Sequence, residues 1–542
     1  MIAAAANLLW LAAQAGAAGR FRRQLHDPAA TQQMVLRGLL NRNAACAYGR
    51  EHGFADIQTP AEFARRVPLA DHDDLAPWID RVRRGEASAL TTERVTHLVP
   101  TSGSSGARKL IPFTRSLQEE FNRAIAPWMI DLYGQHPAAA WGPSYWSISP
   151  ASPDAGREAS AVPIGFEDDT GYLGGASRRL VEATMAVPSL VRQAGDSESF
   201  FFLTLLSLVR RRDLRLVSVW HPSFLLLLLD ALPRHWEAIL AAVRTGRLPG
   251  SLRISPRLSQ AFERLPNATR ARELAEIGPT HAARLWPRLA VISCWTDAHA
   301  SLAATVLAGR FPKVALQPKG LIATEAFVTL PFAGGHPVAV ASHYYEFIDD
   351  AGGVHPVDSL RADHTYEVVV STGGGLWRYR LGDRVRVDGW IGRTPSLRFL
   401  GRASGTSDLF GEKLSEEFVA GVLADLRAAA ATPARFAMLA PEATPTNGHY
   451  TLFWAGGPPP AADELDRRLA ANPHYAWCRR LGQLQPARVS VVRDGAEAAY
   501  YRKQVEAGQK LGDIKLRALA PPGAWSEWFA DGTVVVPTPV EE

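Results

Sequence analysis

The stretch that most constrains this chain is PTSGSSGARKLIPFT, which runs from Pro100 to Thr114 and follows the apolar run VTHLV. Five small residues in a row, Ser102 to Gly106, do not pack a core, and ordering so flexible a loop costs backbone entropy. Hydroxyls and unobstructed backbone N–H groups that follow a strand and end in a cation, Lys109, can wrap phosphate oxygens. The pattern predicts a phosphate-binding loop, with a solvated linker as the alternative.

Two common catalytic motifs are excluded for this loop. Gly106 is followed by Ala107, where a Walker A loop has Lys. There is no G-x-S-x-G elbow nearby, which removes the simplest hydrolase interpretation. The chain has seven lysines among its 59 Lys and Arg residues, so arginine supplies most of its positive charge. In that background Lys109 indicates a need for a compact point charge.

Composition places the chain among ordinary globular proteins. It has 542 residues, of which 47% are hydrophobic and 21% charged, and a net charge of +5. A size of about 150 residues per unit suggests three or four units. The charges are interspersed without a basic stripe, so we expect no nucleic-acid partner. Cys46, Cys294 and Cys478 lie far apart and indicate reduced packing residues in a cytoplasmic protein.

The N-terminal segment IAAAANLLWLAAQAGAAG is uncharged from Ile2 to Gly19. A secretory signal has its positive charges before the apolar region, whereas here Arg20, Arg22 and Arg23 follow it. The segment just reaches spanning length but is rich in alanine rather than in bulky apolar residues. We expect a helix packed on the protein or lying at its surface, without stable membrane insertion; a membrane anchor and a signal are the alternatives.

The order of the segments predicts an α/β fold with a large N-terminal domain. Residues 1–90 are expected to be helical, including a helix from Pro60 to Arg66. From about 90 to 345, strand-like pieces such as RLAVISCW and HPVAVASHYYEFI alternate with helical ones, which indicates sheets covered by helices. The apolar runs at 200–209 and 224–229 are too short to span a membrane and predict buried helices. Short β pieces between about 365 and 400, with a hairpin turn at Gly373 to Gly375, predict a β-barrel-like part.

The chain then restarts as a smaller, mobile α+β domain. The pattern predicts a helix over 416–429, a strand around HYTLFW, a helix from Ala461 and a strand at ARVSVV. The predicted domains are 1–403, which includes the helical region 1–90, and 404–542.

Several motifs resemble one family. TSGSSGARK is similar to the phosphate loop of the adenylate-forming superfamily, which includes acyl-CoA synthetases and luciferases, with Arg108 where proline is common. Five further motifs are similar to those of the acyl acid amido synthetases, a family with plant auxin- and jasmonate-conjugating enzymes and bacterial relatives. They are AYGREHGF (47–54), GLIATEAF (320–327), YEFI (345–348), GGLWRYRLGDRVRV (374–387) and FLGRASGTSDLFGEKLSEE (399–417). Their order and spacing, from about residue 40 to 520, make the resemblance specific.

This resemblance implies a ligase that joins an acid to an amine. A carboxylate resists attack by an amine because it is anionic and lacks a good leaving group, whereas transfer of AMP gives a mixed anhydride that has one. Charge builds on the α-phosphate, so the site must direct cations and donors there. The implied cofactors are ATP and Mg²⁺. The implied substrates are a small carboxylic acid and an amine, expected to be an amino acid, in a cytoplasmic, bacterial enzyme.

The resemblance also implies roles for individual residues. Lys109 would neutralise the β- and γ-phosphates as pyrophosphate leaves. Glu325 would hold Mg²⁺, and Thr324 would place a hydroxyl on the α-phosphate. Asp383 would accept both ribose hydroxyls, and Arg402 would contact ribose or phosphate. The phosphates would be cradled by the loop residues Thr101, Ser102, Gly103, Ser104, Ser105 and Gly106.

Taken alone, several of these residues have simpler interpretations. Thr324 and Glu325 fit the end of a strand with an exposed carboxylate. Asp383 fits a turn cap, and Arg402 fits a surface arginine after a strand. The order of the motifs is what favours the nucleotide site.

The resemblance further implies that the small domain rotates about residues 403–412 between the two half-reactions. One lysine of that domain would then reach the acid and the α-phosphate. Lys515 is the preferred candidate, because DIKL is typical of a strand whose polar residue points into the cleft. Lys510 is the second candidate. Lys413 lies in SDLFGEKL, which resembles the family sequence, but it could equally be a surface cation.

The resemblance implies an acid pocket between the sheet and the helices before the Thr-Glu motif, formed by VSVWHPSF (217–224) and SCWTDAHA (293–300). Trp220, Phe224 and Trp295 would line a flat apolar slot, or else belong to the core. Asp297 stands where small residues are expected and would bind an amino group or cap the following helix. Two other functions stay open: an acyl-CoA ligase that forms a thioester, and a nucleotide-binding protein without catalysis.

Overall fold

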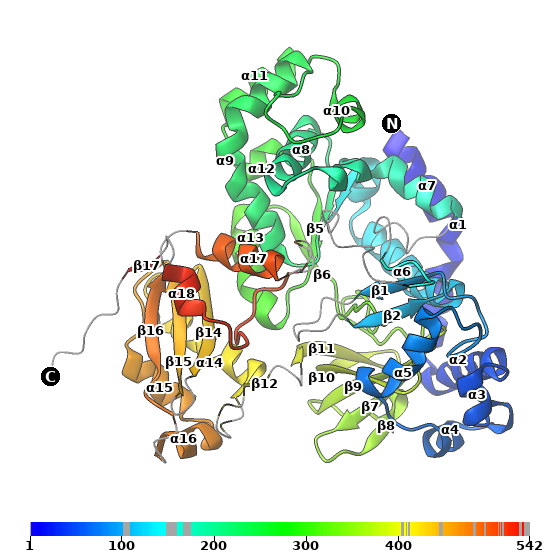
Figure 1. Ribbon diagram of the computed structural model, residues 1–542. Helices are drawn as coiled ribbons and strands as arrows, with labels where there is room; N and C mark the ends of the chain where they lie inside the picture. The colour runs from blue at the N-terminus through cyan, green and yellow to red at the C-terminus, as the bar shows by residue number, and fades with distance from the viewer. Residues whose placement is uncertain are drawn as a thin grey trace. The chain divides into compact units, whose positions relative to one another are not determined.

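The structure of the protein is a computed structural model in which the chain divides into two compact units (Figure 1). The first unit consists of Met1–Asp297, Ser301–Leu381 and Val385–Phe399, and the second of Ala298–Ala300, Gly382–Arg384 and Leu400–Glu542. The structure describes residues 2–100, 109–147, 160–165, 175–402, 406–407, 409, 412, 414–443, 448–480, 484–492, 495–507, 509, 511, 514–530 and 534–535.

The first unit begins with a helical region, as predicted. Capping boxes start two of its helices: Thr59 and Glu62 cap α4, and Asp71 and Asp74 cap α5. These reciprocal hydrogen bonds satisfy backbone N–H groups that have no partner within the helix. The elements are α1 (Ile2–Gln24), α2 (Pro28–Asn43), α3 (Ala47–Glu51), η1 (Phe54–Asp56), α4 (Pro60–Arg66) and α5 (His72–Arg83).

Helix α1 packs on α6 (Arg115–Gln135) and α7 (Gly175–Thr184). The buried side-chain amide of Asn7 donates to the carbonyl groups of Ala140 and Gly142 at 2.9 and 3.1 Å. Among the described residues, α1 is the helix whose length and mean hydropathy of 1.3 would allow it to cross a membrane. Its polar contacts agree with the packed helix that the sequence predicts.

Strands β1 (His97–Pro100) and β2 (Leu110–Phe113) pair antiparallel, so the expected phosphate loop joins two neighbouring strands. Residues 101–108 themselves lie outside the described residues. Thr114 follows β2 and is the N-cap of α6.

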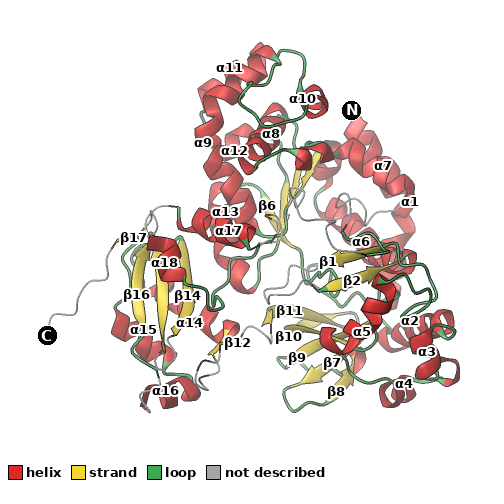
Figure 2. Ribbon diagram, viewed as in Figure 1, coloured by secondary structure: helices red, strands yellow, loops and turns green. Residues whose placement is uncertain are grey.

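A four-stranded parallel sheet contains β3 (Ser144–Trp146), β4 (Leu216–Ser218), β5 (Val291–Cys294) and β6 (Ala315–Pro318), in this order. The helices that connect its strands lie around it (Figure 2). The two apolar runs belong to α8 (Ser197–Arg210) and α9 (Pro222–Thr245), which confirms the prediction of helices there. The other connecting elements are η4 (Ser189–Gln193), α10 (Pro256–Phe262), α11 (Ala268–Ile277), α12 (Ala282–Leu285), η5 (Ala298–Ala300) and α13 (Ser301–Arg310).

A second, five-stranded sheet has the order β11-β10-β9-β7-β8. It forms the predicted β-rich part, and the segment between β9 and β10 contains Gly373 to Gly375, as expected for a turn between neighbouring strands. Its elements are β7 (Tyr344–Asp349), β8 (Val354–Pro356), η6 (Val357–Ser359), β9 (Thr365–Ser371), β10 (Tyr379–Ile391) and β11 (Thr394–Arg402).

The prediction of strand for HPVAVASHYYEFI is right only for its second half, β7. Before β7, the backbone changes partner from residue to residue: the N–H of Val338 bonds to Pro395, that of Ala339 to Val328, and that of Ser342 to Ala339. A ladder needs a constant partner strand, so the segment forms only isolated bridges, such as Thr329 with Val338.

The second unit is an α+β arrangement around a sheet of order β14-β15-β16-β17. Helix α14 has the bounds that the sequence predicts, Glu416–Ala429, with Ser415 as its N-cap. Its core includes Leu452 and Trp454. The elements are β12 (Thr406–Ser407), β13 (Leu414–Ser415), α14, β14 (Phe436–Ala443), β15 (Gly448–Ala455), α15 (Ala462–Leu469), α16 (Pro473–Arg480), β16 (Arg488–Val492), α17 (Ala496–Glu506), α18 (Trp525–Ala530) and β17 (Val534–Val535).

Candidate active site

Thr324 and Glu325 lie at the tip of a tight turn after β6. The N–H of Ala323 donates to the carbonyl of Ala326 at 2.9 Å, and Ile322 and Phe327 form an antiparallel bridge just outside it. Glu325 is only 5% exposed. The turn therefore presents a hydroxyl and a carboxylate next to each other, rather than the exposed strand end that was the alternative.

Both backbone polar groups of Phe327 fix this turn. The N–H of Phe327 donates to Nε2 of His343 at 3.1 Å, and the carbonyl accepts a hydrogen bond from the Tyr345 hydroxyl at 2.7 Å. Burial raises the pKa of Tyr345 well above its ordinary value, so the hydroxyl keeps its proton and stays a donor. The residue two positions after Glu325 is thus held from both sides.

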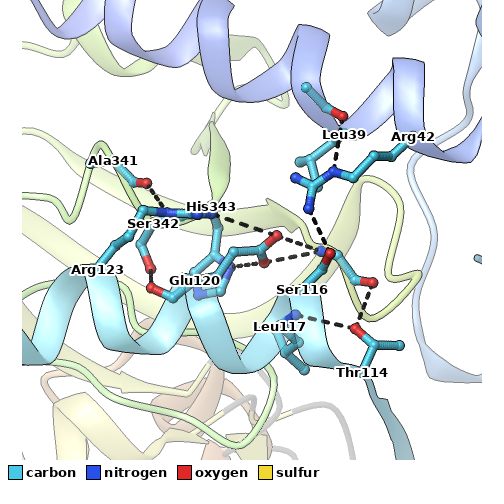
Figure 3. Close-up of polar contacts among 12 residues, drawn as sticks. Leu39, Arg42, Thr114, Ser116, Leu117, Glu120, Arg123, Ala341, Ser342 and His343 are labelled. Atoms are coloured by element: carbon cyan, nitrogen blue, oxygen red, sulfur yellow. Dashed lines mark hydrogen bonds and ion pairs between the residues drawn. The ribbon is translucent and has the colours of Figure 1, made fainter. Parts of the chain in front are cut away.

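His343 in turn contacts Glu120 of α6, and neither side chain is exposed (Figure 3). Nδ1 of His343 lies 2.8 Å from Oε2 of Glu120. Because Nε2 accepts from Phe327, we assign the imidazole proton to Nδ1, which donates to the carboxylate. The same carboxylate accepts the N–H of Gly373 at 3.0 Å.

Thr114 completes this network at the start of α6. Its hydroxyl donates to the carbonyl of Gly373 at 2.9 Å and accepts from the N–H of Leu117 at 3.1 Å. Glu120 and Thr114 together hold both backbone groups of Gly373, the residue directly before the motif GGLWRYRLGD. The network therefore joins the end of β2, the turn before β10 and the Thr-Glu turn, which lie in or next to three of the predicted nucleotide motifs.

Helix α6 is also anchored to α2. Arg42 donates to Oγ of Ser116 at 2.5 Å (Figure 3), and Ser116 donates through its N–H to Glu93 at 2.9 Å and through its hydroxyl to the same carboxylate. The helix that carries Glu120 is thus fixed at its first turn.

Sequence reasoning missed Glu120 and His343. Glu120 falls on the buried face of α6 with Leu117, Phe121 and Ala124. A carboxylate at helical spacing among apolar residues was the available signal, since a buried carboxylate requires partners.

Lys109 directly precedes β2 and is partly buried. Its charge acts on Asp71 and His72 at the start of α5. Hydrogen bonds from the backbone of Asp74 and Asp73, helped by Lys109, hold the pKa of Asp71 below its ordinary value. The loop residues Thr101 to Gly106 lie outside the described residues, so their predicted role stays a prediction.

The motifs YEFI and GGLWRYRLGD meet in a buried ion pair. Arg378 donates through Nε and Nη2 to the two oxygens of Glu346 at 2.8 and 2.9 Å. Its Nη1 donates to the carbonyl groups of Ala64 and Val67, both at 2.8 Å. These motif residues therefore have a structural role, which is to fix the chain just before β10.

Asp383 lies on the buried side of β10. It is 3% exposed and alternates with Leu381 and Val385, which are buried too. Gly382 before it has a φ of +72°, a conformation that disfavours other residues. Asp383 is part of an internal strand rather than a cap before one. It belongs to the second unit and Glu325 to the first, so their convergence on one nucleotide stays a prediction.

Among the other predicted residues, Arg402 ends β11, and its side chain lies outside the described residues. Lys413 and Lys510 lie outside them as well. Lys515 is partly buried between the buried Ile514 and Leu516, and its carbonyl accepts a hydrogen bond from the Tyr500 hydroxyl at 2.9 Å.

The prediction of a strand at DIKL is wrong. Residues 514–517 have no regular secondary structure, and the segment pairs with the edge strand β14 only later, where Leu519 bridges Leu439. The N–H of Leu439 bonds to Ala518, and that of Ala520 to Leu439. A single bridged residue gives no ladder, so Lys515 precedes this contact and is not part of a strand.

On the acid side, the register of the parallel sheet aligns Trp146, Ser218, Ser293 and Gln317 across one face. Nε1 of Trp128 in α6 donates to Oε1 of Gln317 at 3.0 Å, so α6 covers this face. The carboxyl ends of parallel strands are where α/β sheets bind ligands.

Lys319 lies two residues beyond Gln317 on the same face, and sequence reasoning assigned it no role. Its Nζ is 2.7 Å from Oγ of Ser218 and lies over the rings of Trp220, Trp128 and Trp146, at 4.6, 5.3 and 5.5 Å from their centroids. It is 2% exposed, and burial lowers its pKa to about 7. The sequence feature that could have identified Lys319 is its position immediately after a strand in a chain with few lysines.

Two of the three aromatic residues predicted for the acid slot come together. The rings of Trp220 and Trp295 are 5.5 Å apart, and both side chains are partly exposed. Phe224 is 2% exposed on α9, which favours the core alternative for this residue. Asp297 accepts from the N–H of Phe399 at 3.4 Å and lies 3.8 Å from Arg398; burial raises its pKa.

Within the described ranges, no group of three or more His, Cys, Asp or Glu side chains is arranged to hold a metal ion. Mg²⁺ at nucleotide sites usually takes only one or two carboxylates and completes its shell with phosphates and water. The carboxylate of Glu325 beside the Thr324 hydroxyl is a hard oxygen donor set of this kind, so these residues fit the ion.

Comparison with known proteins follows the same division of the chain. The GH3 family N-terminal, central and C-terminal domains match residues 17–307, 337–402 and 417–523. A probable indole-3-acetic acid-amido synthetase, GH3.12 of Oryza sativa subsp. japonica, is 28% identical over 93% of both chains. The indole-3-acetic acid-amido synthetase GH3.15 of Arabidopsis thaliana is 26% identical over 71% of this chain and 70% of its own. These relatives are plant proteins and give no support to the expected bacterial source.

Among solved structures, the AtGH3.15 acyl acid amido synthetase in complex with 2,4-DB has a TM-score of 0.85 at 20% identity and covers 96% of each chain. A 2-hydroxyisobutyryl-CoA ligase in complex with 2-HIB-AMP has a TM-score of 0.50 at 12% identity, covering 88% of this chain and 89% of its own. At these identities the likeness concerns the fold, which this chain shares with both proteins and which confirms the predicted α/β class.

Proposed function

The chain belongs to the GH3 family, and from this premise we propose that its substrates are ATP, a carboxylic acid with a flat apolar body and an amino acid. The chain is a ligase that adenylates an acid and transfers the acyl group to an amine, as its relation to the amido synthetases indicates. The observation that carries the detailed proposal is the Glu120 network, which ties the Thr-Glu turn and the residue before GGLWRYRLGD to the helix that follows β2.

The first half-reaction forms the acyl adenylate. A carboxylate oxygen of the acid attacks the α-phosphorus of ATP, a new P–O bond forms, and the bond to the β-phosphate bridging oxygen breaks to release pyrophosphate. Lys109 neutralises the leaving pyrophosphate, and the loop residues 101–106 donate backbone N–H groups to the phosphates. Thr324 donates its hydroxyl to the α-phosphate, where charge builds.

The second half-reaction forms the amide. The amine nitrogen attacks the acyl carbon, the C–N bond forms, and the C–O bond to AMP breaks while the amine loses a proton. The mixed anhydride makes AMP a good leaving group, so the requirement at this stage is the orientation of the two reactants.

Glu325 is the proposed magnesium ligand. When bound, Mg²⁺ supplies positive charge to the phosphates. The chain contributes a carboxylate held in place, because the turn that carries Glu325 is clamped at Phe327 by His343 and Tyr345. A rigid turn positions the carboxylate before the nucleotide binds.

Asp383 is proposed to accept the ribose hydroxyls and Arg402 to contact ribose or phosphate. We further propose that residues 403–412 are the hinge between a large domain, 1–403, and a small domain, 404–542, in a cytoplasmic enzyme. Rotation of the small domain would bring Lys515 to the acid and the α-phosphate for the first half-reaction.

A Coenzyme A ligase is the second candidate, since one fold neighbour carries that name. The first half-reaction would be the same, but a thiol would attack the adenylate and a thioester would form. A protein that binds nucleotide without catalysis is the third.

The test is pyrophosphate exchange with ATP over a panel of carboxylic acids, followed by trapping with each of the amino acids or with Coenzyme A. We expect exchange with at least one acid and trapping by an amino acid. Thioester formation alone would favour the second candidate, and nucleotide binding without exchange the third.

Glu325→Ala tests the metal assignment in the same assay. We expect it to abolish exchange and to keep the thermal unfolding transition, whereas the exposed control Glu276→Ala should keep both. Full exchange by Glu325→Ala would show that the assignment is wrong.

A further inference from the structure

A buried lysine without a carboxylate partner is the feature that the proposed reaction leaves unexplained. Lys319 is 2% exposed. In the part of the chain that the structure describes, the side-chain hydrogen-bond acceptor for its Nζ is Ser218, and the titratable group that acts on its pKa is the Cys294 thiol rather than a carboxylate. Cys294 stays a neutral thiol because burial raises its pKa to about 12. A buried ammonium normally requires a counter-charge or several acceptors.

The surroundings of Lys319 are aromatic. The faces of Trp128, Trp146 and Trp220 surround Nζ, and such faces attract a cation without accepting directed hydrogen bonds. Of the three N–H bonds of an ammonium, one points to Ser218. The neighbouring Oγ of Ser293, aligned with Ser218 across the sheet, is buried and has no hydrogen-bond partner among the described residues. In this site, Nζ of Lys319 has one hydrogen-bond partner and Oγ of Ser293 has none among the described residues.

This site lies at the carboxyl edge of the parallel sheet, beside residues predicted to bind the acid. Trp146, Trp220 and Trp295 are partly exposed there, so the aromatic enclosure is not sealed within the core. Lys319 is joined to the Thr-Glu turn by a short rigid connection. Gly320 has a φ of +74°, and a Cβ on it would lie 2.6 Å from Oγ1 of Thr329, which also accepts the N–H of Leu321 at 2.8 Å.

We propose that Lys319 determines the specificity for the acid substrate by hydrogen bonding to an acceptor oxygen that the acid carries at a distance from its reacting carboxylate. The preferred acid is a flat ring, sandwiched by indoles, with a hydroxyl or carbonyl oxygen directed at Nζ. The proposal rests on the proposed function, because it concerns the acid pocket of that reaction. A site built to hydrogen bond an oxygen discriminates strongly against the analogue that lacks it, because its own polar group is then left unpaired.

The test compares matched acids that differ by one oxygen: benzoate with 4-hydroxybenzoate, and phenylacetate with 4-hydroxyphenylacetate. In the exchange assay we expect the wild type to favour the hydroxylated member by roughly tenfold or more in kcat/KM, the factor that one charged hydrogen bond is worth. Lys319→Met should abolish this preference through KM, because it removes both the hydrogen bond to the hydroxylated acid and the unpaired Nζ that disfavours the plain acid. The exposed Lys313→Met is the matched control and should behave as the wild type.

A binding measurement separates this proposal from the proposed function. Quenching of tryptophan fluorescence by the same four acids, without ATP, reports on the indoles around Lys319. If no acid supports exchange but the hydroxylated acids still bind more tightly to the wild type than to Lys319→Met, the proposed function fails and the role of Lys319 stands. The role of Lys319 would be overturned if Lys319→Met weakened the binding of the plain and the hydroxylated acid equally. It would also be overturned if the wild type showed no preference between the two acids. If Lys319→Met loses its near-UV circular dichroism, Lys319→Gln, which retains N–H donors, replaces it.

Discussion

Nδ1 of His343 lies 2.8 Å from Oε2 of Glu120, and the two residues are 223 positions apart in the chain. Neither side chain is exposed. The pair connects a helix that begins at the end of β2 with the segment that leads into β7. Through Phe327 and Gly373, the same pair fixes the Thr-Glu turn and the turn before β10.

Glu120→Gln should destabilise the protein by about 2 kcal/mol or more. A carboxylate accepts from both His343 and Gly373, whereas the amide nitrogen of Gln would face one of these donors and leave it unpaired in a dry site. The free energy of unfolding in urea measures the loss. Glu119→Gln is the matched control, since Glu119 is half exposed and pairs with the exposed Arg115. An unchanged unfolding midpoint for Glu120→Gln would show that the network adds nothing to stability.

The buried pair Glu346–Arg378 leads to a second prediction. Glu346→Gln should cost about 3 kcal/mol, because it leaves the guanidinium of Arg378 uncompensated inside the protein. Glu367→Gln breaks a similar two-bond pair with Arg380, on the same sheet, in which the arginine side chain is 47% exposed. That change should cost less than about 1 kcal/mol. Thermal unfolding measures both changes. If Glu346→Gln and Glu367→Gln lost the same stability, burial would not set the strength of these ion pairs.

Lys515→Ala should lower adenylation far more than amide formation from a supplied acyl adenylate, because the lysine is proposed to act only in the first half-reaction. Pyrophosphate exchange measures the first rate, and amide release from chemically prepared acyl adenylate measures the second. Lys510→Ala tests the second candidate in the same way. Equal losses of both rates in Lys515→Ala would refute its role in a rotating domain.

Local patterns predicted the elements that depend on local forces. The bounds of α14 follow from Ser415 as N-cap and from helical spacing of apolar residues, and those of α4 from the capping box at Thr59. The strand within RLAVISCW is β5, a fully buried apolar run. In such segments, the residues that decide the structure are neighbours in sequence.

The features that the sequence did not reveal depend on distant partners. Residues 336–343 alternate like a strand, but their backbone bonds go to three different segments. The apolar alternation around Lys515 resembles a strand, yet the partner edge, β14, contacts the chain only at Leu519. The role of Glu120 depends on its contact with His343, and that of Lys319 on its contact with Ser218. No local sequence pattern predicts either contact.

The same reasoning explains why the nucleotide motifs were found and the acid site only in part. Motifs such as GLIATEAF are continuous in sequence, so their residues can be read together. The acid side is assembled from strands that lie tens of residues apart, and Trp128 reaches it from a helix that precedes them all. Trp220 and Trp295 were predicted because they lie in segments that the family resemblance assigns to the acid pocket, whereas Trp128 and Lys319 required the register of the sheet.

The last prediction concerns the pH dependence of stability. Burial lowers the pKa of Lys319 from 10.5 to about 7. Between these two values the unfolded chain binds a proton that the folded protein does not, so this group makes stability rise with pH, by at most about 1.4 kcal/mol per pH unit. Its contribution is fully present above pH 10.5 and is lost as the pH falls toward 7. Ser218 and the three indoles favour the charged form, so they oppose the effect of burial and narrow the pH range over which stability changes; the Cys294 thiol acts in the same direction.

Lys319→Met removes this titration. The variant should therefore gain stability relative to the wild type, most at pH 7 and progressively less toward pH 10, when unfolding in urea is measured at each pH. Lys313→Met changes an exposed lysine, so its curve should run parallel to that of the wild type. Parallel curves for Lys319→Met as well would mean that Lys319 stays protonated in the folded protein across this range, held by the indole faces and Ser218 more strongly than burial opposes it.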